Sequence, residues 1–502
     1  MSFISPLIRY ALFQLNVSKY WLNFVRAKEA LCCNSRMPVD IVPIDFMERA
    51  IQLSRLDSEY LSRAVRGTDV FIDAINRKTY VDGIEELLII ENSINRQLPY
   101  NISERVSYVF ILYLHQRDCL NPSQLCKLKS FATFLTSNME YYGATWTNNH
   151  FLNNVRSIIF IAHMTKDADL LAKGLSFLEL ALLVLFKDQG YRERSTSYLL
   201  LIQYWLKSIS VCIGLFDCNK KRQINILQSE LIKLIKQFHV ECIERLNFGD
   251  NTPDFSKSNI VKLSGFFDQF FENISFSNEK WLLLFSSAGK KCFFITSGVN
   301  KKGPEHGHRN LGCFSLLLDD NELLFQTNSR AAYGVRSNTF PEDPGFTSSG
   351  HIMINGKELY ATSVNLPIFR GYKNPRLSPK FTLKSLTERK MSYSVQSKLH
   401  NADIAVSITL DNDEICFELV INKDARFSYD FLLASQYSFN GREVFSKGRS
   451  FQVLFDQNSC YVEEIRVAVS EEYGSTNTQS LIRFHFFKKY TTNNIMFKEV
   501  KT

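Results

Sequence analysis

The hydrophobic pattern of this 502-residue chain changes its period once, near residue 283. From about residue 8 to residue 280, apolar residues recur three and four positions apart, which is the spacing of amphipathic helices. After residue 283, short runs alternate apolar and polar residues, as half-buried strands do. A chain of this length also exceeds the size of a single hydrophobic core. We therefore predict a helical domain over residues 1–280 and an antiparallel β domain over residues 281–502.

The helical half divides into amphipathic segments separated by short polar breaks, such as Asn121-Pro122. Short breaks favour helix hairpins with antiparallel neighbours. No repeat of fixed length is present, so a strict solenoid is not predicted, and a bent or ring-like stack of hairpins remains open. The predicted helices cover residues 8–28, 46–65, 84–94, 104–116, 123–142, 148–164, 170–186, 195–213, 222–245 and 257–272.

Three hairpins are predicted in the second half, each from two apolar runs around a polar turn. The clearest turn is Asn355-Gly356, the preferred pair for a tight type I′ turn. Regularly spaced short strands with polar turns are typical of a β-sandwich. The paired runs are 352–354 with 358–360, 316–318 with 323–325, and 405–410 with 415–421.

A net charge of +8 and an aromatic content of 13% narrow the class of partner. The positive balance suits an anionic partner. Nucleic acid is not expected, because the sequence has no Lys/Arg-rich arm and no recognisable nucleic-acid module. An acidic polysaccharide fits, since aromatic side chains line grooves that suit sugar rings. The oligomeric state is not indicated.

The cysteines and the first residues of the chain bear on its location. The 11 cysteines form no C-x-x-C pattern and are odd in number, which favours free thiols in a reducing compartment. The N-terminal residues lack the basic and then apolar order of a signal peptide. The most apolar run, Leu175 to Phe186, is too short to span a bilayer and predicts a buried helix. We expect a cytoplasmic protein without a transmembrane segment, with a periplasmic or secreted location as the alternative.

The first motif that could carry chemistry is Thr-Asn-Asn-His-Phe-Leu-Asn-Asn at residues 147–154, where a predicted helix begins. On a helix, His150 lies on the same face as Asn153 and Asn154. Amides and an imidazole are costly to bury unpaired, and they suit the binding and neutralisation of a carboxylate. The alternative is a group of capping residues, since Asn is favoured at helix starts.

The second motif, KDQGYRERSTSY at residues 187–198, joins two apolar helices through a glycine loop. A surface loop explains most of it, with Asp188 as a cap and Gly190 at a positive φ. It does not explain Tyr198, which follows Arg194 by one helical turn. A guanidinium beside a phenol favours the ionised phenol, which makes Tyr198 a candidate general acid or base.

The third motif is Gly-Pro-Glu-His-Gly-His at residues 303–308, between two predicted strands. Its histidines, His306 and His308, could share a metal ion, with His351 beside a later glycine loop as a third member. The alternative is a pair of solvent-exposed loop histidines.

In this order, the motifs N-N-H-x-L-x-N, D-x-G-x-x-E-R-S-x-S-Y and G-P-x-H-G-H resemble those of the heparinase II/III-like polysaccharide lyases, including the related alginate lyases. The resemblance is closest over residues 139–213 and continues over residues 294–356. That family joins an (α/α) toroid to an antiparallel β-sandwich and cleaves uronic-acid-containing polysaccharides by β-elimination. The resemblance implies this fold and this activity for the chain.

The resemblance also implies roles for four residues. Asn149 and His150 match the Asn-His pair that binds and neutralises the uronate carboxylate, and His150 can also serve as the base for one epimer. Tyr198 matches the tyrosine that abstracts the C5 proton or protonates the leaving oxygen. His306 matches a histidine of the catalytic cleft. Further substrate contacts are expected from Asn148, Arg192, Glu193, Arg194, Tyr333 and Arg336.

A structural zinc ion is the one cofactor that the resemblance implies. His308 and His351 match two of its ligands, but Gln326 stands where the third ligand, an aspartate, is expected. A neutral amide is a poor zinc ligand beside two histidines. We expect the chemistry itself to need no cofactor.

The predicted function is cleavage of an acidic polysaccharide by β-elimination. Amide and imidazole donors aimed at the carboxylate would stabilise the enolate-like transition state while a phenol moves the proton. The alternative is a catalytically degenerate glycan-binding protein that takes part in cell-surface polysaccharide assembly. That alternative is suggested by Gln326, by Arg309-Asn310 in place of the family's Ala-Asp, and by the lack of a signal peptide.

Overall fold

The structure is a computed structural model of the chain. The predicted helices over residues 8–28 and 46–65 lie outside the described residues. The structure describes residues 67–89, 99–117, 119–141, 149–186, 195–216, 220–237, 243–248, 257–268, 282–296, 311–328, 347–359, 379–469, 477–487 and 492–500.

Every predicted helix from residue 84 onward overlaps a helix in the structure. One helix, α4, was missed, although Phe71 and Ala74 bury one of its faces. The helices are α4 (Thr68–Arg77), α5 (Tyr80–Ile89), α6 (Pro99–His115), α7 (Pro122–Ser137), α9 (Asn149–Thr165), α10 (Ala168–Phe186), α11 (Thr196–Gly214), α12 (Lys221–Gln237) and α13 (Lys257–Asp268), with a 3₁₀ turn, η2, at Ile243–Arg245.

The polar break at Asn121-Pro122 is the start of α7. The Asn121 side chain accepts a hydrogen bond from the backbone N–H of Gln124 at 2.9 Å. The Gln124 side chain accepts one in return from the Asn121 N–H at 3.0 Å. This reciprocal cap satisfies two backbone donors that the first helical turn leaves open, and Pro122 follows where its missing N–H costs nothing.

Helix α9 lies in the protein interior, because nearly all of its side chains are buried. It packs along α6, where the rings of Phe110 and Phe160 stack with centroids 4.0 Å apart. An apolar helix that is covered on all sides belongs to a protein interior. Residues 149–154 of the first motif therefore lie on a buried helix that is packed against α6.

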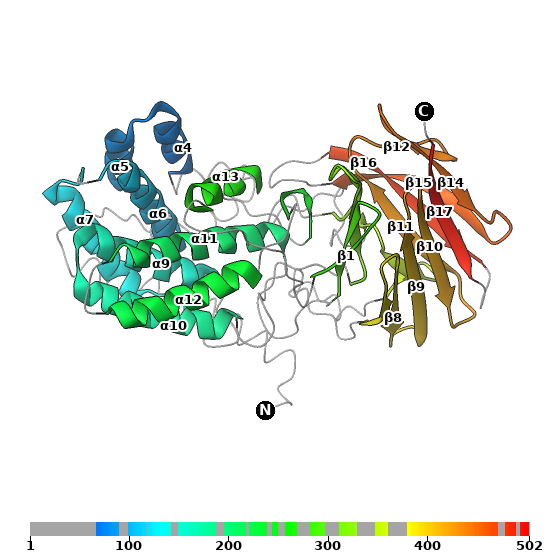
Figure 1. The fold of residues 1–502 in the computed structure, drawn as a ribbon, viewed down its shortest axis with the longest axis horizontal. Helices are drawn as coiled ribbons and strands as arrows, with labels where there is room; N and C mark the ends of the chain where they lie inside the picture. The colour runs from blue at the N-terminus through cyan, green and yellow to red at the C-terminus, as the bar shows by residue number, and fades with distance from the viewer. Residues whose placement is uncertain are drawn as a thin grey trace, which may run out of the picture. The chain divides into compact units, whose positions relative to one another are not determined.

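The second half forms two antiparallel sheets (Figure 1). The first has the order β1-β2-β3-β4-β11-β16-β15, with β5 beside β11 and β6 beside β5, and the second has the order β12-β13-β14-β17-β10-β9-β8-β7. The first sheet contains β1 (Leu282–Ser287), β2 (Lys290–Ile295), β3 (Phe314–Leu317), β4 (Leu323–Gln326), β5 (Ile352–Ile354), β6 (Lys357–Glu358), β11 (Phe427–Leu433), β15 (Cys460–Val469) and β16 (Asn477–Phe486). The second contains β7 (Lys380–Leu386), β8 (Lys390–Ser397), β9 (Ala402–Leu410), β10 (Glu414–Ile421), β12 (Ser438–Phe439), β13 (Glu443–Phe445), β14 (Ser450–Phe455) and β17 (Asn493–Val500).

A shared aromatic core joins the two sheets into a sandwich. Phe417 on β10 meets Phe431 on β11 with ring centroids 4.8 Å apart, and Phe325 on β4 meets Phe497 on β17 at 4.9 Å. The late strands β16 and β17 lie inside their sheets, β16 between β11 and β15 and β17 between β14 and β10. The predicted fold class, helices followed by an antiparallel β-sandwich, is confirmed.

The three predicted hairpins are present as β3–β4, β5–β6 and β9–β10. In the β5–β6 turn, Asn355 and Gly356 have φ angles of 51° and 71°. Two successive positive φ angles define the type I′ turn that this residue pair prefers.

The chain divides into two compact units, and the division falls within α11. The first unit is residues 1–185 with 209–227, and the second is residues 186–208 with 228–502. In the second unit, Thr196 at the start of α11 hydrogen-bonds to the carbonyls of Leu246 and Phe248. The carbonyl of Asn247 accepts a hydrogen bond from Thr327 beyond β4 at 2.8 Å. The boundary at residue 280 stays a prediction; α13 ends at Asp268 and β1 begins at Leu282.

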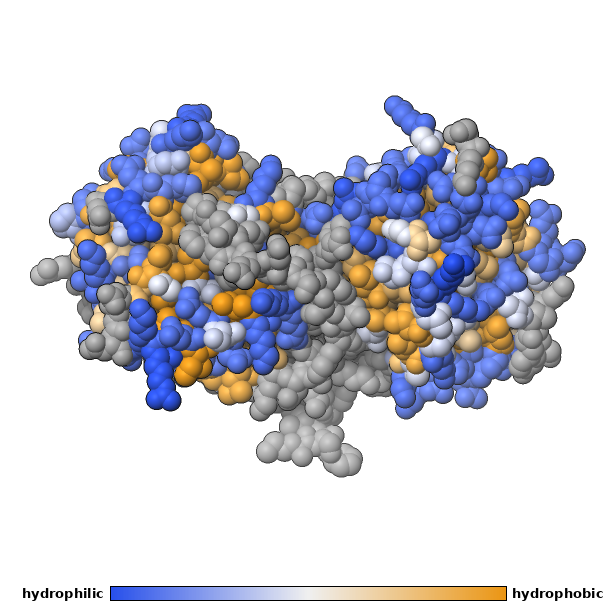
Figure 2. Space-filling view, viewed as in Figure 1, coloured by the Kyte–Doolittle hydropathy of each residue, from blue (hydrophilic) through white to orange (hydrophobic). Residues whose placement is uncertain are grey.

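Helix α11 is long and apolar enough to cross a membrane, but its apolar window is almost entirely buried within the protein. This is the environment of a core helix and does not indicate a transmembrane segment. Exposed large apolar side chains among the described residues are spread over several elements, such as Ile89 on α5, Leu183 on α10 and Leu386 on β7. Figure 2 shows apolar patches interrupted by hydrophilic residues over one face, which is ordinary for a globular protein.

Candidate functional site

His150, in the first turn of α9, is paired with a buried carboxylate. Its Nδ1 atom lies 3.0 Å from Oε1 of Glu140. The His150 side chain is 37% exposed, whereas that of Glu140 is 1% exposed. The ring of Tyr100, at the start of α6, packs against the imidazole with centroids 4.3 Å apart. The imidazole is thus fixed on one side and open to solvent on another.

Asn154 holds Glu140 in place. Its side-chain amide donates to Glu140 Oε2 at 3.2 Å and to Ser103 Oγ on α6 at 3.1 Å. Its carbonyl oxygen accepts the backbone N–H of Glu140 at 3.0 Å. Because the carboxylate is bonded through both of its oxygens and through its own backbone, its position is set by α6 and α9 together.

Asn153 belongs to a second buried network between the same helices. Glu104 on α6 accepts hydrogen bonds at one oxygen from Asn153 Nδ2 at 2.7 Å and from Arg156 Nη2 at 2.8 Å. The side chains of Glu104 and Arg156 are fully buried, so each needs the other to offset the loss of water. Asn153 and Asn154 thus bind residues outside their own helix rather than capping it, and Asn149 beside them is 1% exposed.

Tyr198 lies in the first turn of α11 and is 6% exposed. Its backbone N–H donates to Ser195 Oγ at 3.3 Å, which helps to cap the helix. Through Thr196 this turn is attached to the segment at residues 246–248. Tyr198 belongs to the second unit, whereas Asn149 and His150 belong to the first. That the three face one cleft stays a prediction.

The other predicted site residues, His351 excepted, fall outside the described part of the chain. They are Asn148, Arg192, Glu193, Arg194, His306, His308, Tyr333 and Arg336.

His351, the predicted metal ligand, lies before β5 and binds a carboxylate of the sandwich. Its Nδ1 atom is 3.2 Å from Oδ2 of Asp430 on β11. Arg483 on β16 donates to both oxygens of Asp430 at 2.8 Å. Burial acts to raise the pKa of Asp430, but the hydrogen bonds and charges of Arg483 and His351 outweigh it and hold that pKa below its ordinary value. The three side chains form a compact buried network.

The residues near His351 do not fit the zinc ion that the motif resemblance implies. Gln326, in the place of the expected aspartate, directs its amide nitrogen at the Leu433 carbonyl and at the side-chain oxygen of Gln479. The Gln326 amide is neutral and already hydrogen-bonded, so it does not replace the anionic aspartate as a zinc ligand. Among the described residues, no group of three His, Cys, Asp or Glu side chains is placed to hold a metal. We derive no chemical step through a metal.

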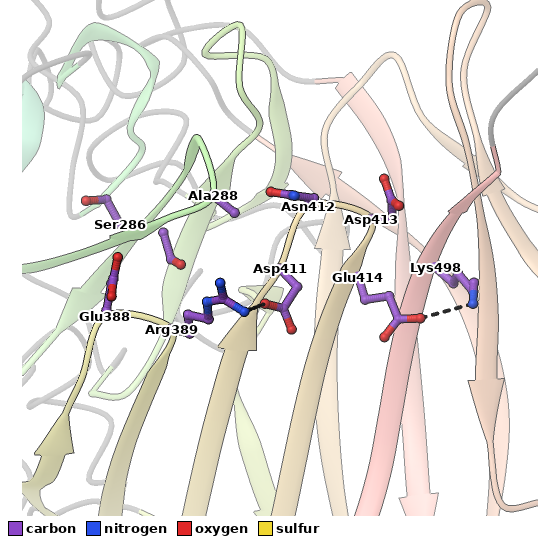
Figure 3. A pocket seen from close by; sticks show the side chains of 10 residues that line it. Ser286, Ala288, Glu388, Arg389, Asp411, Asn412, Asp413, Glu414 and Lys498 are labelled. Atoms are coloured by element: carbon purple, nitrogen blue, oxygen red, sulfur yellow. Dashed lines mark ion pairs between the residues drawn. The ribbon is translucent and has the colours of Figure 1, made fainter.

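A pocket of about 540 Å³ lies among the turns at one end of the sandwich (Figure 3). Arg389 and Asp411 form an ion pair at 3.7 Å, and Lys498 and Glu414 form another at 3.1 Å. The buried Lys290 at the start of β2 donates hydrogen bonds to the carbonyls of Asp411 and Asn412, and it thus links the β1–β2 turn to the β9–β10 turn. The pocket is lined by Ser286, Ser287, Ala288, Glu388, Arg389, Asp411, Asn412, Asp413, Glu414 and Lys498. Four carboxylates against two cations disfavour an anionic polymer here.

Comparison with solved structures bears on the whole fold. A heparinase III gene product matches with a TM-score of 0.56 and 12% identity, over 83% of this chain and 72% of that chain. The chain has the fold of heparinase III. A second heparinase III structure gives a TM-score of 0.55 at 12% identity, over 82% and 71% of the two chains.

A mutant of heparan sulfate lyase HepC from Pedobacter heparinus also shares the heparinase III fold. It matches with a TM-score of 0.54 at 13% identity, over 92% of this chain and 78% of that chain. No family model matches the sequence, and no curated protein matches it. The likeness therefore lies in the backbone and extends over both the helical and the β-rich halves.

Sequence reasoning missed Glu140 and Tyr100, two residues that contact the His150 side chain. Glu140 precedes His150 by ten residues and Tyr100 precedes it by fifty, so no helical spacing links them. The only signal was indirect: four amides and an imidazole at one helix start require polar partners if they are buried.

Proposed function

We propose that this chain is a polysaccharide lyase that cleaves an acidic polysaccharide next to a uronate by β-elimination. The proposal is supported by the heparinase III fold and by the net charge of +8, which favours an anionic polymer. The observation that carries it is the pair of His150 and the buried Glu140, at the helix start where the motif places the carboxylate-binding residues.

The chemistry requires removal of the weakly acidic proton at C5 of the uronate. Asn149 acts at the uronate carboxylate, where hydrogen-bond donors stabilise the charge that develops as the proton leaves. His150 either joins Asn149 there or serves as the base for one epimer. As the C5–H bond breaks, its electrons form the C4=C5 double bond and the bond from C4 to the glycosidic oxygen breaks. Tyr198 supplies the proton for that leaving oxygen or removes the C5 proton. His306 is proposed as a further residue of the cleft.

The products identify the reaction, because the new double bond is conjugated with the carboxylate and absorbs in the ultraviolet. We expect purified full-length protein to raise this absorbance on at least one member of a panel of uronate polysaccharides. Tyr198→Phe removes only the phenolic oxygen and should reduce turnover by at least about 100-fold. Folded protein that produces no unsaturated uronate on the whole panel would contradict the proposal.

A second candidate function is glycan binding without turnover, and Gln326 is the observation that favours it. Its amide replaces the aspartate that the motif resemblance leads us to expect, so this chain departs from the family at that position. Under this proposal, an acidic oligosaccharide binds equally well to wild-type protein and to Tyr198→Phe, and no product forms. Isothermal titration of both proteins with the same oligosaccharide separates the two functions.

A further inference from the structure

We propose that Glu140 is a positioning residue that keeps the proton of neutral His150 on Nδ1, so that His150 acts as the base through Nε2. The inference rests on the proposed lyase function for its kinetic consequence, but the position of the proton is a property of the protein alone. It decides between two roles that the motif left open for His150, which are neutralising the uronate carboxylate and removing the C5 proton.

The hydrogen bonds around Glu140 identify it as an acceptor. Its Oε2 receives the amide N–H of Asn154, and its Oε1 faces His150 Nδ1 at 3.0 Å. The donor at Oε2 favours the ionised carboxylate, which can only accept hydrogen bonds. The atom that faces Oε1 must then carry a hydrogen, which puts the proton on Nδ1. In the neutral imidazole, Nε2 is consequently the atom with the lone pair.

Burial makes this assignment firm. Glu140 is 1% exposed, so water cannot replace the imidazole as its partner without opening the α6–α9 interface. The other buried carboxylate of that interface, Glu104, is already bonded to Arg156 at 2.8 Å. Glu140 is therefore the carboxylate that acts on the imidazole. A buried carboxylate that orients a histidine through Nδ1–H is also how serine hydrolases fix the tautomer of their general base.

Packing fixes the plane of the ring as well as its proton. Tyr100 lies against the imidazole with centroids 4.3 Å apart and an angle of 43° between the planes. Rotation about the Cβ–Cγ bond would both break the bond to Glu140 and push the ring into Tyr100. A base held in one orientation needs no reorganisation when the substrate binds, which is an advantage in a site of this kind.

The consequence is a division of labour in the elimination. His150 Nε2 takes the C5 proton and becomes the imidazolium, whose new charge Glu140 offsets. The C5–H electrons form the C4=C5 double bond, the C4–O bond breaks, and Tyr198 protonates the departing oxygen. The imidazolium then returns its proton to water, and the Tyr198 phenolate regains one. Neutralisation of the carboxylate falls to Asn149, and the enzyme favours the C5 epimer whose proton faces His150.

Nitrogen NMR of full-length protein labelled with ¹⁵N-histidine tests the proton position without any substrate. His150→Gln identifies the signals of His150 by their loss. For the neutral ring, we expect a protonated Nδ1 and an unprotonated Nε2 in wild-type protein, and a mixture of tautomers in Glu140→Leu. A neutral ring that carries its proton on Nε2 in wild-type protein would overturn the proposal.

Kinetics provide the second test. Glu140→Gln keeps the shape and an oxygen acceptor but removes the charge that offsets the imidazolium, so kcat should fall by about 100-fold with KM changed less than about threefold. Glu140→Asp should recover part of kcat. The matched control is Glu179→Gln, the same change at an exposed glutamate on α10 that bonds Gln223.

The two tests keep this proposal separate from the proposed function. If no polysaccharide is cleaved, the NMR result still decides where the proton lies. If cleavage occurs and Glu140→Gln retains full kcat while its melting temperature is unchanged, the positioning role is wrong and the lyase function stands.

Discussion

The two halves of the chain each pair a histidine with a buried aspartate or glutamate. The two pairs differ in the exposure of the histidine and in the other partners of the carboxylate. In the helical unit, His150 is 37% exposed, and its partner Glu140 accepts a hydrogen bond from the side-chain amide of Asn154. In the sandwich, His351 is 7% exposed and its partner Asp430 receives two further bonds from a guanidinium. We therefore expect the buried pair in the sandwich to be structural, and the more exposed pair in the helical unit to serve the proposed chemistry.

The largest effect is expected from exchanging the two histidines for alanine in parallel. His150→Ala should lower kcat/KM by about 1,000-fold, since a positioned base contributes about 100- to 10,000-fold. His351→Ala should leave the chemical step intact and lower the free energy of unfolding by about 2 kcal/mol, because it removes a hydrogen bond to a charged group. Initial rates and urea unfolding of both variants provide the measurements. An equal loss of activity in both variants would contradict the assignment of different roles to His150 and His351.

The next largest effect is expected from breaking the ion pair between Asp430 and Arg483. Asp430→Asn should destabilise the protein by about 3 kcal/mol, because it removes the buried anion that pairs with the partly buried Arg483. The control is Glu463→Gln, which removes the exposed partner of His485 and should cost less than about 1 kcal/mol. Denaturant midpoints of the two variants, compared with wild type, give the result; similar values would show that burial of the pair carries no weight.

The dependence of this difference on pH sharpens the comparison. The pKa of Asp430 is lower in the folded protein than in the unfolded chain, so its ionised form favours folding. That contribution is complete above the unfolded pKa of about 4 and disappears as the pH falls through the lower folded pKa. The stability gap between wild type and Asp430→Asn should thus be constant from pH 7 to about pH 5 and shrink below about pH 4. A stability gap that widens as the pH falls would contradict this prediction.

The smallest effect is expected from removing metal. Gln326 is bonded through its amide to Leu433 and Gln479, and Asp430 is paired with Arg483, so we expect these contacts to brace the sandwich without a metal ion. Exhaustive chelation should leave the melting temperature and the rate of polysaccharide cleavage unchanged. Gln326→Leu serves as a positive control for loss of the brace and should lower the melting temperature. A fall on chelation alone would indicate that a metal contributes after all.

The fold was predictable where its cause was local. The period-two runs and the Asn355-Gly356 turn specify strands and a hairpin through neighbouring residues, and the structure confirms them. Likewise Asn121 and Pro122 mark a helix start by their own chemistry. Helix α4 was missed because it is short and buries only a few apolar residues.

The partners of the site residues were not predictable, because they depend on how distant segments pack. Nothing in the residues around Arg156 indicates that it lies fully buried against Glu104, fifty-two positions earlier. In the same way, Arg483 and His351 reach one carboxylate from strands far apart in the sequence. Single-sequence reasoning identified His150 by its type and spacing, whereas its partner Glu140 is evident only in three dimensions.

The inner positions of β16 and β17 have a consequence for how the protein is made. Both strands come late in the chain, yet each completes the middle of its sheet rather than an edge. Their pairings with β11 and β10 span tens of residues, and such non-local contacts form slowly compared with helices. During synthesis, the helices of the first half can fold early. The sandwich cannot be completed until Val500 has left the ribosome, so its earlier strands are exposed without their partners until then. Expression at low temperature or with chaperones should therefore help the sandwich more than the helices.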